Sequence, residues 1–544
     1  MQSDVSKLTL ANIWIAFITF LLAAALGLYQ VAERSGLFPK IESIPLYFAS
    51  VSSHGVIMGF VLTTFFIMGF GYWISSTSLK IPLWGGNKLG WIGFLTSLTG
   101  TVIAAVLLLT GKASVLYTFY PPLKAPPLFY IGATLLVVGS WVWCLQMVMT
   151  MLQWKKQNPG ENVPLVMFGN TANAILWFIT SLGVASEVLF QLIPWSLGWI
   201  DTVDVGLART LFSWTLHAIV YFWLIPAYIA MYTLVPKAAG GYLFSDELGR
   251  VSFIMLLVFS VPIGMHHLYV DPFQSAGWKF MHMLGTFMVA VPTLFTGFTV
   301  IASLEVAGRL HGGKGLFGWI KTIPWDKPIV LAGGLSLLML TIGGWGGLVN
   351  ASYSLDVMVH NTQWITGHFH LIFAGTTVIM YFGIAYYIWP SLTGKPIMSE
   401  RLARIQLWLW FIGMLVLTLP WHILGLLGQP RRIGAAPYAG EVADKYVASW
   451  HIPEVSMLVG GVILFLSSVL LILVLAGSLL KRKLPARPEM LYAESLYPVI
   501  NLPKLLNGFG FWTMVIAVYL IASYGYPILQ FFLMETHGTF PWSV

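Results

Sequence analysis

About thirteen apolar runs, each long enough to cross roughly 30 Å of hydrocarbon, follow one another along this sequence. They lie near residues 10–31, 47–74, 89–110, 128–152, 164–193, 208–236, 248–269, 278–306, 328–349, 360–391, 402–428, 452–480 and 508–533. No soluble domain or linker separates them. The sequence therefore predicts a single transmembrane domain over residues 1–544, an all-α polytopic membrane helix bundle.

The composition agrees with a membrane protein. Hydrophobic residues make up 58% of the chain and charged residues only 9%, whereas soluble proteins average about 25% charged residues. The formal net charge of +8 needs no nucleic-acid partner, because cytoplasmic Lys and Arg next to a lipid bilayer account for it. The single Cys144 excludes a disulfide framework and a Cys-rich metal site within the chain.

The distribution of Lys and Arg predicts the orientation in the membrane. With the N-terminus inside, about two thirds of the 28 Lys and Arg residues fall in cytoplasmic segments, including the cluster Lys481-Arg482-Lys483. The N-terminus is therefore expected in the cytoplasm, and an odd number of helices places the C-terminus outside. The first apolar run is too long for a signal peptide, so a retained membrane helix is expected there.

Two histidines stand two residues apart in the middle of the tenth run, in Gly367-His368-Phe369-His370. Residues i and i+2 of an α-helix point about 200° apart, so the two imidazoles face opposite sides of one helix. Each could hold a separate cofactor. Hydrogen-bonded core histidines are the plain alternative, although ionisable residues inside membrane segments are costly and usually functional.

The remaining buried histidines favour cofactor binding. His54, His217, His368 and His370 lie about eight to ten residues into helices that run inward, and His266 and His267 lie near the outer end of a helix that runs outward. All six then fall in one layer, roughly 5–15 Å below the outer surface at 1.5 Å per residue. A chance scatter of core histidines does not explain such a layer.

The geometry sorts the six into two groups. Pro262 and Gly264 permit a distorted turn that brings the adjacent His266 and His267 together. With His217 opposite, three imidazoles suit a copper or zinc ion with an open position. His368 would face that pocket, and His54 would meet His370 across a haem, because two imidazoles saturate a haem iron whereas one leaves a position for a small ligand.

Hydroxyl groups extend from this site toward the cytoplasmic side. Tyr221 lies four residues after His217, on the same helix face, and Tyr228 and Tyr232 continue that face inward. Thr293 and Thr296 offer hydroxyls at a similar depth. This series would suit proton delivery, with Tyr221 supplying a proton and an electron to an O–O bond; ordinary helix packing is the alternative.

Charged groups are expected above the layer. Arg431 and Arg432 follow the eleventh run, and Asp356, His360 and Asn361 open the tenth helix. Paired guanidinium groups at this place would neutralise haem propionates. Ordinary interfacial basic residues are the alternative interpretation.

Taken together, these residues resemble subunit I of the haem–copper terminal oxidases, and most closely the type B, ba3-type cytochrome c oxidases. The resemblance covers nearly the whole chain. It is carried by WTLHAIVY (214–221), GMHH (264–267), VHN (359–361), GHFH (367–370), PRR (430–432), VLYTFYPPL (115–123) and NAS (350–352).

The resemblance implies roles for individual residues. His54 and His370 would ligate a low-spin haem b, and His368 a high-spin haem of the a type. His217, His266 and His267 would bind the copper ion CuB, with Tyr221 cross-linked to His217. The residues near the propionates would be Arg431, Arg432, Asp356, His360 and Asn361.

Two departures from the commoner type A oxidases favour type B. Ile219 stands where type A enzymes carry Glu, and the loop near residues 75–87 lacks their Asp. The Tyr and Thr series is then the remaining candidate for proton uptake. A nitric oxide reductase on the same histidine frame stays open but lacks the counterpart of Tyr221, and a cofactor-free transporter would not explain the histidine layer.

The expected function is four-electron reduction of O2 to water, with proton uptake and translocation, in a prokaryotic inner membrane. Cytochrome c is the expected electron donor, with quinol as the alternative. Because the chain has no Cys pair, a dinuclear copper (CuA) would belong to a subunit II. A further small membrane subunit is also expected as a partner.

Overall fold

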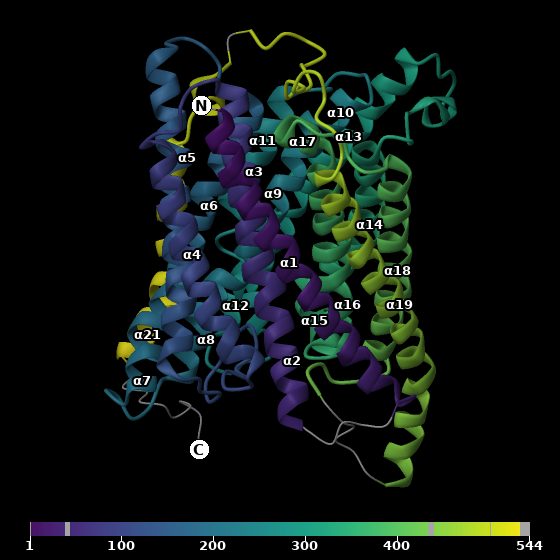
Figure 1. The fold of residues 1–544 in the computed structure, drawn as a ribbon. Helices are drawn as coiled ribbons and strands as arrows, with labels where there is room; N and C mark the ends of the chain where they lie inside the picture. The colour runs from purple at the N-terminus through teal and green to yellow at the C-terminus, as the bar shows by residue number, and fades with distance from the viewer. Residues whose placement is uncertain (1, 39–43, 434–439, 501, 534–544) are drawn as a thin grey trace.

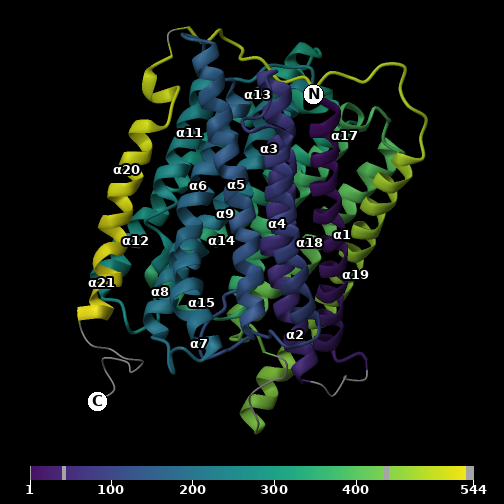
Figure 2. The same cartoon turned by 60° about the vertical axis from the view of Figure 1, so that its left-hand side comes forward.

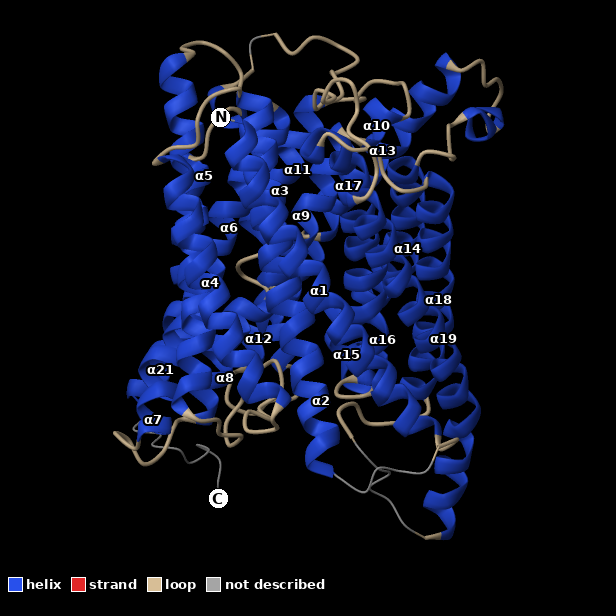
Figure 3. Cartoon of the chain, in the orientation of Figure 1, coloured by secondary structure: helices blue, strands red, loops and turns tan. Residues whose placement is uncertain are grey.

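The computed structural model describes residues 2–38, 44–433, 440–500 and 502–533, which form a bundle of long helices running in nearly the same direction (Figure 1). Loops gather at the two ends of the bundle (Figure 3). Within these ranges there is no β-strand, only the isolated bridges Leu243–Ser495 and Thr362–Pro430. The predicted all-α fold is confirmed.

The first part of the chain forms thirteen α-helices, two π-helices and one 3₁₀-helix. They are α1 (Gln2–Ser35), α2 (Ile44–Val56), the π-helix η1 (Ile57–Leu62), α3 (Thr63–Leu79), α4 (Gly86–Leu109), α5 (Pro127–Gln157), α6 (Leu165–Glu187), the π-helix η2 (Val188–Leu192), α7 (Ile193–Leu197), α8 (Val205–Leu216), α9 (Ala218–Thr233), α10 (Val235–Ala238), α11 (Asp246–Phe259), the 3₁₀-helix η3 (Gly264–Leu268), α12 (Ala276–Met288) and α13 (Ala290–Leu310).

The second half continues the bundle in the same way. Its segments are the 3₁₀-helix η4 (Gly318–Thr322), α14 (Pro328–Ala351), α15 (Tyr353–Val359), α16 (Gln363–His370), the π-helix η5 (Leu371–Val378), α17 (Ile379–Thr393), α18 (Glu400–Leu426), α19 (Glu441–Leu479), the 3₁₀-helix η6 (Lys504–Leu506), α20 (Gly510–Leu520), the π-helix η7 (Ile521–Gly525) and α21 (Tyr526–Leu533).

Twelve helical stretches among the described residues are long and apolar enough to cross a membrane. The predicted seventh helix, 248–269, differs from the other runs. Its α-helix, α11, has 14 residues and ends at Phe259, and a turn with Pro262 leads into η3. Proline removes a backbone donor and clashes with the preceding turn, so the helix ends there. The two ends of the described chain lie at opposite ends of the bundle, where α1 begins and α21 ends (Figure 2).

Glycines allow α4 and α5 to approach closely. A Cβ atom at Gly139 would lie 2.5 Å from the carbonyl oxygen of Gly93, and one at Gly100 would lie 2.3 Å from that of Gly132. On each helix the two glycines, Gly93 and Gly100 or Gly132 and Gly139, are seven residues apart, which is about two helical turns. Membrane helices lack a hydrophobic driving force for association, so close packing of small residues contributes to holding α4 and α5 together, along with the hydrogen bond from the Ser97 hydroxyl to the Leu136 carbonyl (3.1 Å).

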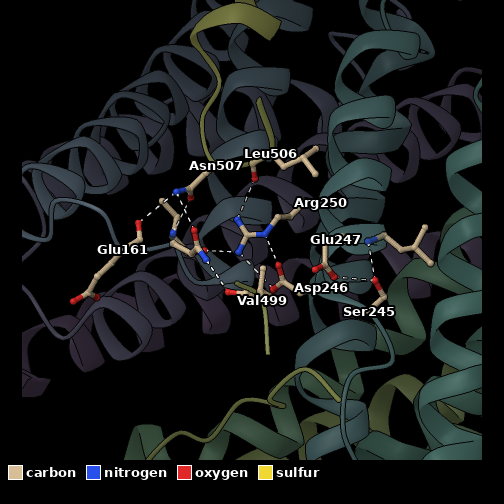
Figure 4. A network of polar contacts seen from close by, with 11 residues as sticks. Glu161, Ser245, Asp246, Glu247, Arg250, Val499, Leu506 and Asn507 are labelled. Carbon is tan, nitrogen blue, oxygen red and sulfur yellow. Dashed lines mark hydrogen bonds and ion pairs between the residues drawn. The ribbon is translucent and has the colours of Figure 1, made fainter. Parts of the chain in front are cut away.

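A buried cation fixes the end of the bundle at which α1 begins. Arg250 is 2% exposed, forms an ion pair with Asp246, and donates to the carbonyl oxygens of Val163 (2.7 Å) and Leu506 (3.3 Å) (Figure 4). Asn507 in turn accepts a hydrogen bond from the Val163 nitrogen at 2.9 Å. This network ties α11 and the start of α6 to the C-terminal segment.

We expect Gly139→Ala to destabilise the protein by about 1–3 kcal/mol, because the added methyl group overpacks the α4–α5 contact. The matched control is Gly344→Ala on α14, where a Cβ atom meets nothing within 4 Å; alanine there should be neutral or stabilising by up to about 1 kcal/mol. Thermal unfolding midpoints in detergent compare the two variants. Equal midpoints would contradict the packing argument.

Candidate functional site: a histidine-lined cavity

All six predicted histidines line one cavity of about 310 Å³ in the middle of the bundle: His54, His217, His266, His267, His368 and His370. They come from α2, the junction of α8 and α9, η3 and α16. The layer inferred from helix direction and rise per residue is therefore one continuous space in the folded chain. His368 and His370 come from one helix, so the cavity extends along both sides of α16.

His54 and His370 face each other as a pair. Their ring centres are 6.1 Å apart and their planes differ by 16°. Two imidazoles on opposite sides of one metal ion, each with a metal–nitrogen bond of about 2 Å, have ring centres roughly 6 Å apart. The observed spacing therefore leaves room for one iron between the two rings.

Backbone carbonyls orient three of the rings. The Nδ1 atoms of His54, His370 and His368 lie 2.8, 2.8 and 3.1 Å from the carbonyl oxygens of Ala23, Thr366 and Gly343. A carbonyl oxygen can only accept, so each Nδ1 carries the proton. Each Nε2 is then left with a free lone pair, which is the tautomer that a metal-binding imidazole needs.

His217, His266 and His267 form a compact group, with one ligand atom from each lying within 4.8 Å of the others. His217 Nδ1 is 3.2 Å from His267 Nε2, and His266 Nδ1 is 3.0 Å from the hydroxyl of Thr286. Three nitrogen ligands at this spacing suit a copper ion with an open position. The predicted convergence of His266 and His267 is present.

Local departures from the α-helix place these rings. The 3₁₀-helix η3 carries His266 and His267, and His217 sits at the break between α8 and α9. The π-helix η1 begins three residues after His54, and the π-helix η5 begins directly after His370. π-helical turns are rare and occur frequently at functional sites.

The predicted hydroxyl series is in contact with the histidine group at one end. The Tyr221 hydroxyl is 3.0 Å from His217 Nε2. Farther along α9, Tyr232 is 2.6 Å from the hydroxyl of Thr296 on α13, and the Tyr228 hydroxyl lies 3.4 Å from that of Thr293. The series runs from the cavity toward the end of the bundle at which α1 begins.

Charged groups line the opposite end of the cavity. Arg431, Arg432, Asp356 and His360 border it. Arg431 donates to the Asn361 side-chain oxygen at 2.9 Å, and Asp356 accepts from His360 at 2.5 Å. Burial lowers the pKa of Arg431 to about 10, and the charge of Arg432 acts in the same direction. Arg431 therefore keeps its positive charge at neutral pH.

One predicted detail differs in the structure. His360 and Asn361 do not belong to the tenth helix, since α15 ends at Val359 and α16 begins at Gln363. Asn361 has a φ of 59°, a left-handed conformation that Asn tolerates better than most residues and that breaks a helix. Sequence reasoning also missed Thr286, the partner of His266, because nothing in its spacing marks it.

Residues 7–463 match the family described as cytochrome C and quinol oxidase polypeptide I. The chain belongs to this family.

Individual relatives support the assignment over nearly the full length. Cytochrome c oxidase subunit 1 of Thermus thermophilus is 40% identical, covering 97% of this chain and 95% of the relative. The subunit of the same name from Thermostichus vulcanus is 26% identical, covering 77% and 75%. A cryo-EM structure of a heme-copper terminal oxidase dimer superposes with a TM-score of 0.93 at 36% identity, covering 98% and 94%.

The predictions of a haem–copper oxidase subunit I fold and of a terminal oxidase catalytic subunit are therefore confirmed. The protein is a multi-pass membrane protein, and its family implies haem and copper as cofactors. The donor atoms fit these groups, because three rings present a free Nε2 and three further rings form a compact nitrogen-ligand set.

Proposed function

We propose that the cavity holds two haems and one copper ion in the arrangement that the family resemblance implies. His54 and His370 would bind the low-spin haem b, His368 the high-spin haem of the a type, and His217, His266 and His267 the CuB ion. When bound, the high-spin haem and the copper would supply the site at which O2 is reduced to water with four electrons. One observation carries the proposal: all six imidazoles border the same cavity.

Three features of the protein would serve this chemistry. The Tyr221 hydroxyl, 3.0 Å from His217 Nε2, is placed to give up a proton beside the copper ligands. Tyr228, Tyr232, Thr293 and Thr296 would pass protons toward it from the cytoplasmic side. The surrounding apolar helices limit access of bulk water, which strengthens electrostatic interactions inside the cavity.

The charged end of the cavity would bind the haem propionates. Arg431 and Arg432 provide the positive charge, and Asp356, His360 and Asn361 complete the polar rim. Buried anionic groups need such partners, because an unpaired charge in a low-dielectric environment is strongly unfavourable.

The chain's own residues support a subtype, a set of partners and an orientation. Ile219 and the absence of Asp from 75–87 support type B. We infer cytochrome c as donor, with quinol as the alternative, and a subunit II that carries the dinuclear CuA centre. The Lys and Arg bias supports a cytoplasmic N-terminal end in a prokaryotic inner membrane, and the position of α21 at the opposite end of the bundle agrees with an outer C-terminus.

His54→Ala should abolish the low-spin haem signal and leave the CO-binding haem and the copper in place, because His54 faces only His370. A pyridine haemochrome spectrum, a CO difference spectrum and copper analysis measure the three cofactors separately. The control is His311→Ala, whose ring bonds the Ala239 carbonyl away from the cavity. Loss of the CO-binding haem instead would mean that the two sides of α16 are assigned the wrong way round.

Tyr221→Phe should lower steady-state O2 consumption by roughly 10²-fold or more, since a positioned proton donor contributes about that much. Phenylalanine fills the same volume, so both haems and the copper should remain. Tyr228→Phe should act differently, slowing proton-coupled steps while sparing electron transfer between the haems in flow-flash experiments. Normal turnover of Tyr221→Phe with full metal content would remove this tyrosine from the mechanism.

Arg431→Leu should shift a haem midpoint potential downward, because reduction adds a negative charge and the variant lacks a nearby cation. The shift should be on the order of 1 kcal/mol, or about 40 mV for one electron. Arg432→Leu should act in the same direction. Redox titration gives the potentials, and Arg309→Leu, at an exposed ion pair with Glu305, is the control. Unchanged potentials in both cavity variants would argue against propionate binding here.

A further inference from the structure

A carboxyl group without a hydrogen-bond partner is buried beside the cavity. Glu187, the last residue of α6, is 0% exposed, and neither of its carboxyl oxygens has a partner in the described structure. Gln191, four residues later in the π-helix η2, is 7% exposed, and its amide oxygen and nitrogen are also without partners. Leaving four polar atoms buried and unpaired is unfavourable by about 1–3 kcal/mol for each group.

These unpaired atoms point to ordered water. Buried water typically makes about three hydrogen bonds to polar groups that lack other partners. A carboxyl and an amide four residues apart lie on one side of the helix and can enclose it. No cationic side chain forms an ion pair with Glu187 in the described residues, so a neutral, protonated carboxyl is the stable resting form.

The position of Glu187 connects it to the histidine cavity. Thr215 borders that cavity two residues before His217, and its hydroxyl accepts a hydrogen bond from the Val184 nitrogen at 2.8 Å. Glu187 follows Val184 by three residues, about 4.5 Å farther along α6. The carboxyl group therefore lies about one helical turn from a contact with the cavity wall, toward the end of the bundle that holds the charged rim.

Polar groups also lead from Glu187 to the surface at that end. Glu187 lies near Tyr130 and near Tyr120, which also borders the histidine cavity. The Arg209 guanidinium lies 4.5 Å from the Tyr120 ring centre and forms a 2.7 Å ion pair with Asp271. These two side chains are 26% and 14% exposed, so the pair reaches the surface. The buried Nε of Arg209 has no hydrogen-bond partner in the described structure and can hold a further water.

We propose that Glu187, with Gln191 and ordered water between them, is a proton station on the outer side of the oxygen-reducing site. The O–H bond of the resting Glu187 carboxyl breaks when its proton passes to the water beside Tyr120 and leaves past Arg209 and Asp271. A proton arriving through cavity water then forms a new O–H bond on the carboxylate and restores the resting form. No electron is transferred in either step. This inference rests on the proposed function, which supplies the protons, and adds a release route to it.

Infrared difference spectroscopy of the purified oxidase complex, reduced minus oxidised, tests the station directly. We expect a carbonyl-stretch band of a protonated carboxylic acid that changes with redox state and shifts in D2O. Glu187→Gln should lose this band, and Glu187→Asp should shift it. Asn173→Leu is the matched control, because Asn173 is also a buried α6 residue whose side-chain atoms lack partners; it should retain the band.

Proton release from the complex in lipid vesicles is the second readout. Glu187→Gln should keep most of its O2 consumption and lose acidification on the outer side, whereas Asn173→Leu should keep both. An unchanged infrared spectrum in Glu187→Gln, or a band that never responds to redox state, would overturn the station and leave a structural acid. If the unmodified complex consumed no O2, the proposed function itself would fail. If it consumed O2 and Glu187→Gln released protons normally, only the station would fail.

Discussion

The burial of six imidazoles in one cavity is the constraint on which the rest of the structure depends. An imidazole removed from water needs partners for both ring nitrogens, and an apolar bundle offers few. For His54, His368 and His370, a backbone carbonyl satisfies Nδ1. That contact fixes the tautomer and turns each Nε2 into the open cavity, so the helix backbone sets the ligand chemistry before any cofactor binds.

The accepting carbonyls of Ala23, Gly343 and Thr366 lie in the α-helices α1, α14 and α16. The segments that carry or adjoin the histidines, in contrast, depart from the regular α form, which repeats side-chain directions every 3.6 residues. The π-helices after His54, His370 and Glu187, and the 3₁₀-helix carrying His266 and His267, change the direction of side chains at the cavity.

Much of this arrangement could be predicted from the sequence because it depends on simple periodicities. Apolar run length predicts the spans, and rise per residue predicts the common depth of the histidines. The 200° separation of residues i and i+2 predicts the opposite sides of α16. The four-residue spacing also predicts the contact of Tyr221 with His217, which the structure has at 3.0 Å.

The details that could not be predicted depend on tertiary contacts. The break between α15 and α16 rests on the left-handed conformation of Asn361, and the carbonyl of Asn361 accepts the Arg431 amide at 2.9 Å across the chain. No local pattern encodes that contact. Glu187 did carry a signal, since an acidic residue within an apolar run is rare in membrane helices. Its lack of partners, however, is a property of the folded bundle.

The two ends of the cavity differ in a way that bears on how charge would move through it. One end carries fixed charges: Arg431, Arg432, Asp356 and the Arg209–Asp271 pair. The other end continues into neutral hydroxyls, such as Tyr232 and Thr296. Hydroxyls can accept and donate a proton without holding a net charge, so they suit transit through the low-dielectric interior. Fixed charges instead stabilise groups of opposite sign where they stand. On the proposed function, the hydroxyl end would therefore suit proton entry and the charged end would hold the propionates and favour proton release, with the histidine group between them.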